Sequence, residues 1–311
     1  MIAVASNCIV ESTYVIWKEL LLVLLYDGGA GVMELIKFIQ SFSSPFLDIL
    51  FQLITMLGED TFFILVTAVI YWCIDKKLGY KLGFVTLTSA SINLGVKDFF
   101  KVPRPIGEPG IRSLRVHTAE GYSFPSGHTQ NTATIWTFFM IQFKRSWLYA
   151  AGVLMTMLVG LSRLYLGVHT PLDVVGGMII GALWVIIWGY IYEISIKRRD
   201  KRIITAAVVL AIIGLLAFKD ANYYKAVGAL TGLLLGYLIE PRFINFQEKA
   251  SLPMQVLKVS FGMAVLYALR LFLKSILPDI LIADYFRYLI LIVWITMAVP
   301  LIFKRFISSR I

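Results

Sequence analysis

The chain has 311 residues, of which 59% are hydrophobic and only 15% are charged, and its mean hydropathy is +0.79. Soluble globular chains carry about 25% charged residues, so the composition excludes an ordinary soluble protein and predicts an all-α polytopic membrane protein. The net charge of +10 is explained by basic loops and lipid head groups in such a protein, so we expect no nucleic-acid partner.

The first predicted unit covers residues 1–58. Residues 1–32 lack the order of segments found in a signal peptide, and we expect either a disordered or interfacial leader or a reading frame that starts too early, upstream of Met33. Residues 33–42 have apolar positions at helical spacing, which predicts an interfacial helix. Pro45 opens an apolar stretch at 46–57 that we expect to be superficial or re-entrant.

Apolar stretches long enough for transmembrane helices follow along the rest of the chain. The predicted spans are 59–75, 79–96, 127–143, 147–163, 171–192, 203–218, 225–240, 255–273 and 281–303. The basic run at 197–202 is the strongest break in composition, and it divides a unit at 59–202 from a unit at 203–311.

The distribution of basic residues predicts the orientation in the membrane. If 59–75 runs inward, the cytoplasmic loops contain Lys76, Lys77, Lys144, Arg145 and the run at 197–202. Cytoplasmic loops are enriched in Lys and Arg. We therefore expect the loops at 97–126 and 163–171 to face away from the cytoplasm, in what we expect to be the plasma membrane.

These two outer loops hold most of the unusual polar residues. The first contains Lys97 and Arg104-Pro105 and ends in Pro125-Ser126-Gly127-His128; the second contains Ser162-Arg163, His169 and Asp173. Three cations, Lys97, Arg104 and Arg163, can neutralise a phosphate. Ser126-Gly127 at a helix start adds backbone N–H donors and a favourable dipole.

The same loops supply the groups for phosphate transfer. Thr170 is a predicted N-cap and Pro171 the first helical residue, so the Asp173 carboxylate can hold the His169 ring. His169 is then the predicted nucleophile and His128 the acid that protonates the leaving oxygen. Each residue alone has a structural explanation, as a snorkelling cation or a helix cap, but together at adjacent helix ends they predict a catalytic site.

The three motifs resemble the signature of the type-2 phosphatidic acid phosphatase superfamily, with no motif residue missing, over about 97–173. The resemblance implies a six-helix phosphatase core. The apolar spans that continue to 303 depart from that pattern, and as extra C-terminal transmembrane helices they look similar to those of sphingoid-base phosphate phosphatases. The resemblance implies His169, His128 and Asp173 as catalytic residues and a phosphohistidine intermediate, with no metal and no cofactor. It also implies phosphate binding by Lys97, Arg104, Ser126, Gly127 and Arg163.

The expected substrate is a lipid phosphate or diphosphate in the bilayer: an isoprenyl diphosphate first, or a phosphatidate-type or sphingoid-base phosphate. A phosphotransferase would use the same residues, whereas a lipid transporter or scramblase would need the cations but not the His169–Asp173 pair. A catalytically inactive scaffold is disfavoured because both histidines are present. The loop at 106–124, with Arg112, Arg115, His117 and Glu120, either recognises the head group or is simply exposed. The oligomeric state is left open.

Overall fold

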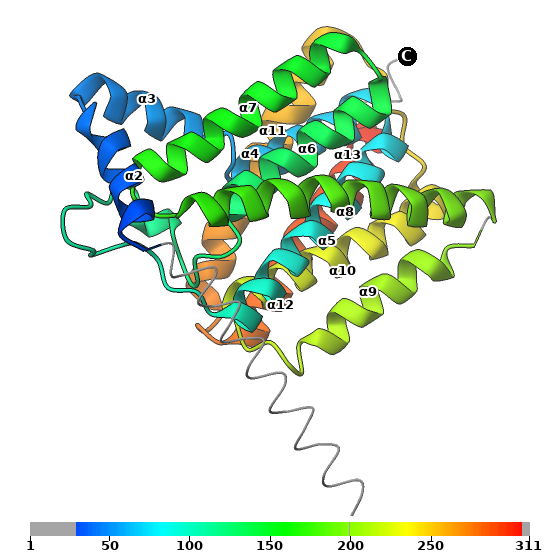
Figure 1. Ribbon diagram of the computed structural model, residues 1–311. Helices are drawn as coiled ribbons and strands as arrows, with labels where there is room; N and C mark the ends of the chain where they lie inside the picture. The colour runs from blue at the N-terminus through cyan, green and yellow to red at the C-terminus, as the bar shows by residue number, and fades with distance from the viewer. Residues whose placement is uncertain (1–28, 199, 307–311) are drawn as a thin grey trace, which may run out of the picture.

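The computed structural model describes residues 29–198 and 200–306, and every regular element in these two ranges is a helix (Figure 1). The predicted fold class is therefore confirmed: the protein is an all-α helical membrane protein with further helices after its core. The leader predicted for residues 1–32 falls almost entirely outside the described residues, which begin at Gly29 in a helix.

The helices follow in chain order with short connections, except for one long loop before α6. The main helices are α2 Gly29–Ser41, α3 Pro45–Met56, α4 Asp60–Val69, α5 Lys76–Phe100, α6 Gly127–Phe143, α7 Ser146–Tyr165, α8 Pro171–Lys197, α9 Arg202–Gly214, α10 Ala221–Ile239, α11 Leu252–Ile276, α12 Leu281–Val293 and α13 Val299–Phe306. Short π-helical segments, η1 Ile70–Ile74, η3 Glu240–Ile244 and η4 Trp294–Ala298, extend α4, α10 and α12, and η2 Val116–Thr118 is a 3₁₀ turn.

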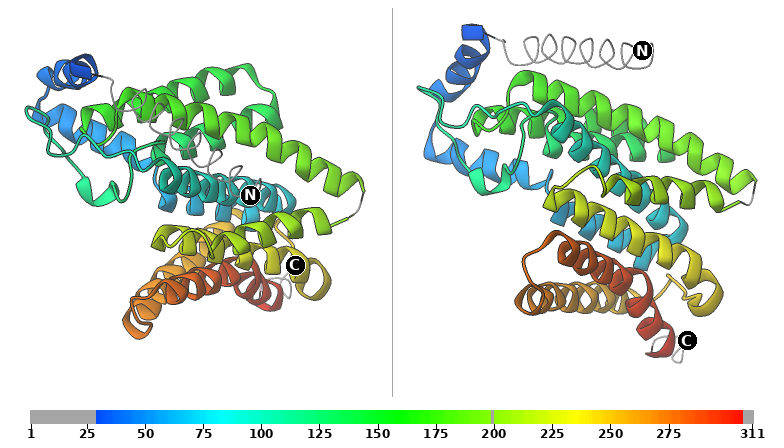
Figure 2. Two further views of the ribbon diagram at one scale, coloured as in Figure 1. Left: turned by 60° about the horizontal axis from the view of Figure 1, so that its bottom comes forward. Right: turned by 90° about the horizontal axis from the view of Figure 1, so that it is seen from below.

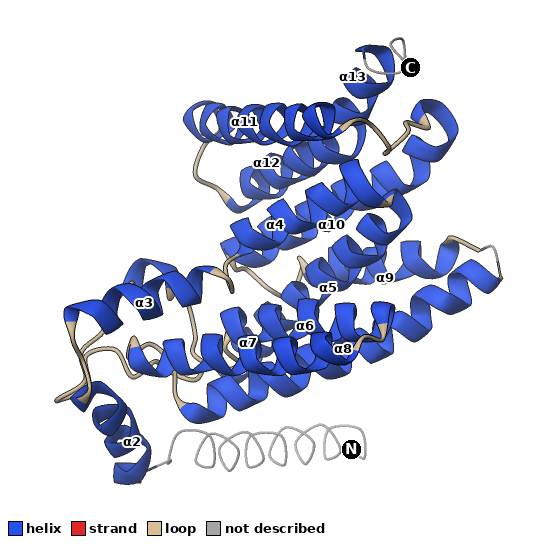
Figure 3. Cartoon of the chain, turned by 90° about the horizontal axis from the view of Figure 1, so that it is seen from above, coloured by secondary structure: helices blue, strands red, loops and turns tan. Residues whose placement is uncertain are grey.

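The helices stack in layers from α7 and α8 at one side to α11 and α12 at the other (Figures 2 and 3). α6 packs on both α7 and α8, α5 joins α6 to α10, and α10 packs on α12. α2 and α3 lie at one end of this stack (Figure 3), and both pack on α7.

Glycines at every fourth position of α10 allow α12 to approach closely. A Cβ atom on Gly228 would lie 2.1 Å from the Tyr285 carbonyl oxygen, and one on Gly236 would lie 2.4 Å from the Thr296 Cβ. Small residues at this spacing let two membrane helices pack backbone to backbone. Close packing thus holds α10 and α12 of the C-terminal unit together, and α10 in turn packs on α5 of the core.

Five helical stretches in the described ranges are long and apolar enough to cross a membrane: Ser146–Tyr165, Pro171–Ser195, Ala221–Ile244, Leu252–Ile276 and Leu281–Arg305. They correspond to five of the nine predicted spans. The prediction of nine was too high by this measure, because α5 is too polar and α6 and α9 have only 17 and 13 residues.

The polar residues of α5 and α6 face each other instead of lipid. Gln130 donates from Nε2 to the Ser89 carbonyl at 2.9 Å, Asn93 donates to Gln130 Oε1 at 2.8 Å, and Ser89 and Thr134 share a hydrogen bond of 3.0 Å. All four side chains are buried. Buried polar groups of a membrane protein must find partners within the protein, so these two helices belong at its centre.

The stretch at 46–75 is one bent pair of helices. α3 and α4 with η1 pass the hydropathy test for a single span together, but they are bent by 49° at the break between them. The predicted span at 59–75 therefore matches α4 with η1, and the segment at 46–57 has the form of either part of a broken span or a re-entrant helix. Ser44 caps α3 by accepting a hydrogen bond from the Leu47 N–H.

Candidate functional site

The two predicted outer loops meet at one end of the helix stack. The Leu114 N–H donates to the Leu166 carbonyl at 2.9 Å, and Ser113 Oγ donates to the Gly167 carbonyl at 3.1 Å. The Ser126 N–H donates to the Asp173 carbonyl at 2.9 Å. These bonds hold the loop before α6 against the turn between α7 and α8, so the residues of all three motifs are brought to one place.

His169 and Asp173 lie next to each other, and both are buried. Asp173 Oδ2 lies 3.4 Å from His169 Nδ1 and accepts a hydrogen bond of 2.7 Å from the Thr170 N–H. Because Asp173 is in the first turn of α8, its carboxylate reaches back to the cap of its own helix. The helix start thereby fixes the carboxylate beside the imidazole, as the sequence pattern predicted.

Ser123 is a site residue that the motifs did not indicate. Its Oγ donates to Asp173 Oδ2 at 2.6 Å and lies 3.3 Å from His169 Nδ1, and the side chain is fully buried. Its position three residues before Ser126 in the loop was the only signal in the sequence, and a lone serine in a polar loop is too common to stand out.

Arg104 faces the other ring nitrogen of His169. Its Nη1 lies 3.0 Å from His169 Nε2, and the guanidinium also donates to the carbonyl oxygens of Val168, Gly121 and Glu120. Burial lowers the pKa of Arg104 to about 10, and it stays protonated at neutral pH. An arginine only donates, so Nε2 must offer its lone pair and the ring proton must be on Nδ1, toward Ser123 and Asp173.

His169 is therefore a neutral imidazole with its lone pair on Nε2. Burial, followed by the positive charges of Arg104, Arg163 and Lys97, lowers the pKa of His169 well below its ordinary value. Both causes disfavour the charged ring. The arrangement keeps a nucleophilic nitrogen available at neutral pH.

Arg163 is fully buried and only partly satisfied. Its Nη1 donates to Thr55 Oγ1 at 2.9 Å, but Nε and Nη2 have no hydrogen-bond partner among the described residues. His128 Nε2 likewise has no partner within the described part of the chain. Buried N–H groups without partners, such as the two of Arg163, are costly, and an anion such as phosphate would satisfy them. Thr55, from α3, is a second residue that sequence reasoning missed.

Lys97 binds the backbone of the loop that precedes α6. The Lys97 side chain is buried, and its ammonium donates to the carbonyl oxygens of Tyr122 and, at 3.4 Å, Ser123. An ammonium has three protons, so one remains for another acceptor. Lys97 thus combines a structural contact to the Ser123 backbone with a positive charge in the site.

Ser126 and Gly127 form the start of α6. Gly127 is the first helical residue, and the buried Ser126 Oγ shares a hydrogen bond of 3.0 Å with Thr129 Oγ1. The first N–H groups of a helix have no partner within the helix. The start of α6 therefore presents donors and a positive dipole end where His128 also lies.

Two close packings position His128. A Cβ atom on Gly58, in the break between α3 and α4, would lie 2.9 Å from both the Cβ and the carbonyl oxygen of His128. A Cβ atom on Gly177 of α8 would lie 2.6 Å from the Ser126 carbonyl oxygen. The helix carrying His128 is held between the bend and α8.

The four residues of the loop at 106–124 that were singled out as possible head-group contacts have different surroundings. Arg112 pairs with Asp48 at 2.7 Å on the surface, His117 is exposed in η2, and Glu120 accepts from Asn222 at 3.2 Å. Arg115 is half-buried and pairs with Glu59. Only Arg115 therefore lies both inward and beside the motif residues.

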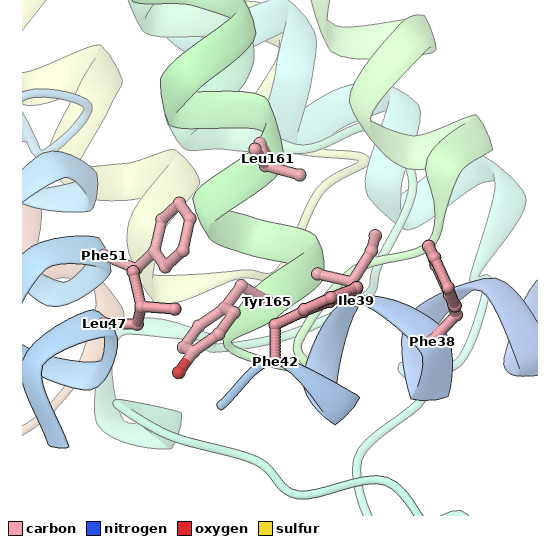
Figure 4. A pocket seen from close by; sticks show the side chains of 7 residues that line it. All are labelled: Phe38, Ile39, Phe42, Leu47, Phe51, Leu161 and Tyr165. Carbon is pink, nitrogen blue, oxygen red and sulfur yellow. The ribbon is translucent and has the colours of Figure 1, made fainter. Parts of the chain in front are cut away.

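An apolar pocket of about 270 Å³ lies between α2, α3 and α7 (Figure 4). Its lining consists of Phe38, Ile39, Phe42, Leu47, Phe51, Leu161 and Tyr165. Neither a motif residue nor any other cationic side chain lines this pocket. It is therefore not the phosphate site, although Tyr165 lies at the end of α7 that carries Arg163.

Sequence profiles match two parts of the chain. Residues 78–197 match the PAP2 superfamily, and residues 224–310 match the transmembrane extension of PAP2 superfamily phosphatases. The first match contains all three motifs and lies inside the predicted unit 59–202, and the second lies inside 203–311.

Several characterised proteins are similar to the chain. Human sphingosine-1-phosphate phosphatase 2 is 35% identical over 144 residues, which is 44% of this chain and 36% of the human protein. Lipid phosphate phosphatase delta of Arabidopsis thaliana is 24% identical over 71% of this chain and 58% of its own length. The crystal structure of Aquifex aeolicus LpxE has 27% identity and a TM-score of 0.46, and covers 53% of this chain and 98% of that chain. The chain spans less than two fifths of the length of the human, mouse and Dictyostelium sphingosine-1-phosphate phosphatases it matches, at 36%, 39% and 38%.

Proposed function

Because this chain carries a PAP2 superfamily domain followed by the transmembrane extension of PAP2 superfamily phosphatases, we propose that it is a membrane enzyme that hydrolyses the phosphate ester of a lipid. The observation that carries the proposal is a pair of unsatisfied buried donors, Arg163 Nε and Nη2, together with the unpartnered His128 Nε2, near a neutral His169 that is oriented by Asp173. A phosphate would satisfy the donors and meet the nucleophile.

In the first step, His169 Nε2 attacks phosphorus and the bond between phosphorus and the lipid oxygen breaks. The imidazole becomes positively charged, and the Asp173 carboxylate stabilises that charge through Nδ1–H. His128, which must enter this step protonated, gives its proton to the departing oxygen. Arg104, Arg163, Lys97 and the start of α6 stabilise the charge on the phosphoryl oxygens.

In the second step, His128 removes a proton from a water molecule, and the resulting hydroxide attacks phosphorus. The phosphorus–nitrogen bond breaks, inorganic phosphate leaves, and His169 and His128 return to their starting protonation states. Every group in this cycle belongs to the chain or the substrate, so we propose that no metal or cofactor takes part.

We propose a sphingoid-base phosphate as the substrate. The expected outward-facing site placed an isoprenyl diphosphate first, because it suits the recycling of a lipid carrier, but the relatives that share 30–35% identity are named sphingosine-1-phosphate or dihydrosphingosine 1-phosphate phosphatases. Helices long enough to span a membrane flank the motifs, which suits a substrate whose chain stays in the bilayer.

We propose further that the site faces away from the cytoplasm, in the plasma membrane. The site lies at one end of the stack, and Lys76, Lys81 and Lys201 lie at the other, where they contact Glu240, Gln142 and the Tyr237 carbonyl. This separation supports the orientation argued from the basic loops.

Cysteine labelling tests the orientation. Cys8 and Cys73 are replaced by serine, and either His117→Cys, beside the site, or Lys197→Cys, at the other end, is introduced. In intact cells, a membrane-impermeant maleimide should label His117→Cys directly and Lys197→Cys only after permeabilisation. The opposite pattern would overturn the orientation and leave the enzymatic proposal standing.

Phosphate release by purified protein in detergent with EDTA tests the function. Sphingosine 1-phosphate, phosphatidate and an isoprenyl diphosphate are compared for the natural protein and for His169→Ala. We expect release that is unaffected by EDTA and is lost in His169→Ala. Release that persists in the variant would refute the nucleophile, and phosphate appearing only on an added alcohol acceptor would indicate a phosphotransferase. Binding of lipid without any turnover would favour a transporter.

A further inference from the structure

Glu59 and Arg115 form an ion pair beside the catalytic residues that belongs to none of the three motifs. Arg115 Nη2 contacts Glu59 Oε1, and the two side chains are 17% and 22% exposed. Arg115 Nε is buried and has no hydrogen-bond partner among the described residues. The pair is therefore largely shielded from water, and its arginine is not fully satisfied.

Glu59 lies on the His128 side of the site. It follows Gly58, whose Cα packs directly on the His128 backbone, and Thr55, one turn earlier, binds Arg163 at 2.9 Å. In the proposed reaction, His128 protonates the oxygen that leaves with the lipid. Glu59 is thus next in the chain to a residue packed on His128, on the side of the site from which the lipid oxygen leaves in the proposed reaction.

Arg115 lies on the His169 side. The two residues before it, Ser113 and Leu114, bind the carbonyl oxygens of Gly167 and Leu166, just before His169. Both Glu59 and Arg115 act electrostatically on Arg163. The pair therefore links the segment packed on His128 with the segment bound to the turn before His169, and neither of its residues is one of the proposed phosphate-binding residues.

A carboxylate at this place repels a phosphate, so its presence needs a reason. The charge on Glu59 is balanced by Arg115 while the site holds no substrate. A lipid phosphate that also carries an ammonium group can exchange partners with this pair, because its phosphate attracts Arg115 and its ammonium attracts Glu59. A phosphate without an amine offers nothing to Glu59, and breaking the pair then leaves a poorly solvated carboxylate.

We propose that the Glu59–Arg115 pair selects an amine-bearing lipid phosphate, with Glu59 binding the ammonium group and Arg115 the phosphate. In a sphingoid-base phosphate the amine is separated from the phosphorus by two carbons and the ester oxygen. That oxygen is the one His128 protonates, so the amine lies on the side where Glu59 is found. This inference rests on the proposed function and names the group that decides the substrate class.

The test compares two substrates that differ only at the nitrogen: sphinganine 1-phosphate, in which it is a charged ammonium, and N-acetylsphinganine 1-phosphate, in which it is a neutral amide. We expect the natural protein to prefer the amine. In Glu59→Gln the ratio of the two kcat/KM values should fall by about tenfold, because one charge-assisted contact is lost for one substrate only. Glu59→Asp, which keeps the carboxylate, should retain most of the preference.

Asp48→Asn is the matched control. It breaks the Arg112–Asp48 pair, which joins the same loop to α3 but lies on the surface, and it should leave the ratio unchanged. An equal loss for both substrates in Glu59→Gln, or an unchanged ratio, would overturn the inference while the enzymatic function stands. Absence of release from both substrates by the natural protein would instead refute the proposed function.

Discussion

Arg104 determines which nitrogen of His169 carries the proton. Its Nη1 lies 3.0 Å from Nε2, and three carbonyl oxygens hold the guanidinium in place. The arginine cannot accept a hydrogen bond, so the lone pair of the ring must be on Nε2. The ring proton is then on Nδ1, which faces Asp173 and Ser123. One residue thus sets the tautomer, adds to the effect of burial in lowering the pKa of His169, and in the proposed reaction supplies charge for the phosphate.

Replacing Arg104 with glutamine should move the acid limb of the pH profile. Removal of a neighbouring positive charge stabilises the imidazolium and raises the pKa of His169. His169 must be neutral to attack, so the normalised kcat/KM should begin to fall at a higher pH than in the natural protein. The absolute kcat/KM should also fall by about 10²-fold from the lost transition-state contact. An acid limb that stays in place or moves to lower pH would contradict the assignment.

Ser123→Ala tests the residue that the motifs missed. The serine hydroxyl donates to Asp173 Oδ2 at 2.6 Å, and its loss should leave the carboxylate free to turn from the imidazole. We expect kcat to fall about tenfold, the worth of one hydrogen bond, with KM and the melting temperature little changed. A fall in the melting temperature at constant kcat would show that Ser123 only supports the fold.

At the scale of helices, the bend between α3 and α4 positions the site. It brings Thr55 to Arg163, Gly58 to His128 and Glu59 to Arg115 within five residues of the chain. A straight helix through 46–75 would direct residues one turn apart to one face only. The bend lets a single segment contact both the proposed phosphate-binding side and the proposed leaving-group side.

Gly58→Ala should disturb this element. The new Cβ would lie 2.9 Å from two His128 atoms and 3.0 Å from Val159 Cγ1, so the bend or α6 must move. Overpacking of this kind costs about 1–3 kcal/mol of stability, which should lower the melting temperature. We expect kcat/KM to fall by more than the loss of folded protein would account for. Gly189→Ala in α8, where a Cβ meets nothing within 4 Å, is the control and should leave both quantities unchanged. Full activity of Gly58→Ala would show that the bend does not position His128.

At the scale of the whole molecule, the site and the anchoring of the C-terminal helices are at opposite ends. Lys76, at the start of α5, pairs with the fully buried Glu240 of η3 at 3.1 Å and also donates to Asn245 and the Phe246 carbonyl. This ion pair joins the core to the extension away from the phosphate site. The same arrangement separates most of the predicted cytoplasmic basic loops from the catalytic residues.

Glu240→Ala should therefore affect stability and leave catalysis unchanged. Removal of one partner of a buried ion pair costs about 3–5 kcal/mol, which denaturation in detergent would measure, while KM of the folded fraction should not change. Glu193→Gln breaks an exposed pair with Lys197, in which the side chains are 60% and 78% exposed, and should have no measurable effect. A loss of activity in Glu240→Ala without a loss of stability would indicate that the two ends are coupled.

Whether a feature of this protein was predictable depends on how close together in the chain its interacting residues lie. The start of α8 at Pro171, with Asp173 reaching back to Thr170, was predictable because capping involves neighbours in the chain. The hydrogen bonds between α5 and α6, which correspond to the predicted spans at 79–96 and 127–143, were not predictable for the opposite reason. Hydropathy cannot show that the polar residues of α5 and α6 satisfy one another.

The sequence by itself determined the helical membrane class and the three motifs, since both depend on composition and spacing along the chain. Only the tertiary structure decided that Thr55, Glu59 and Ser123 belong to the site. Their partners, Arg163, Arg115 and Asp173, are 108, 56 and 50 positions away. Contacts over such separations depend on how helices bend and pack, which no local pattern records.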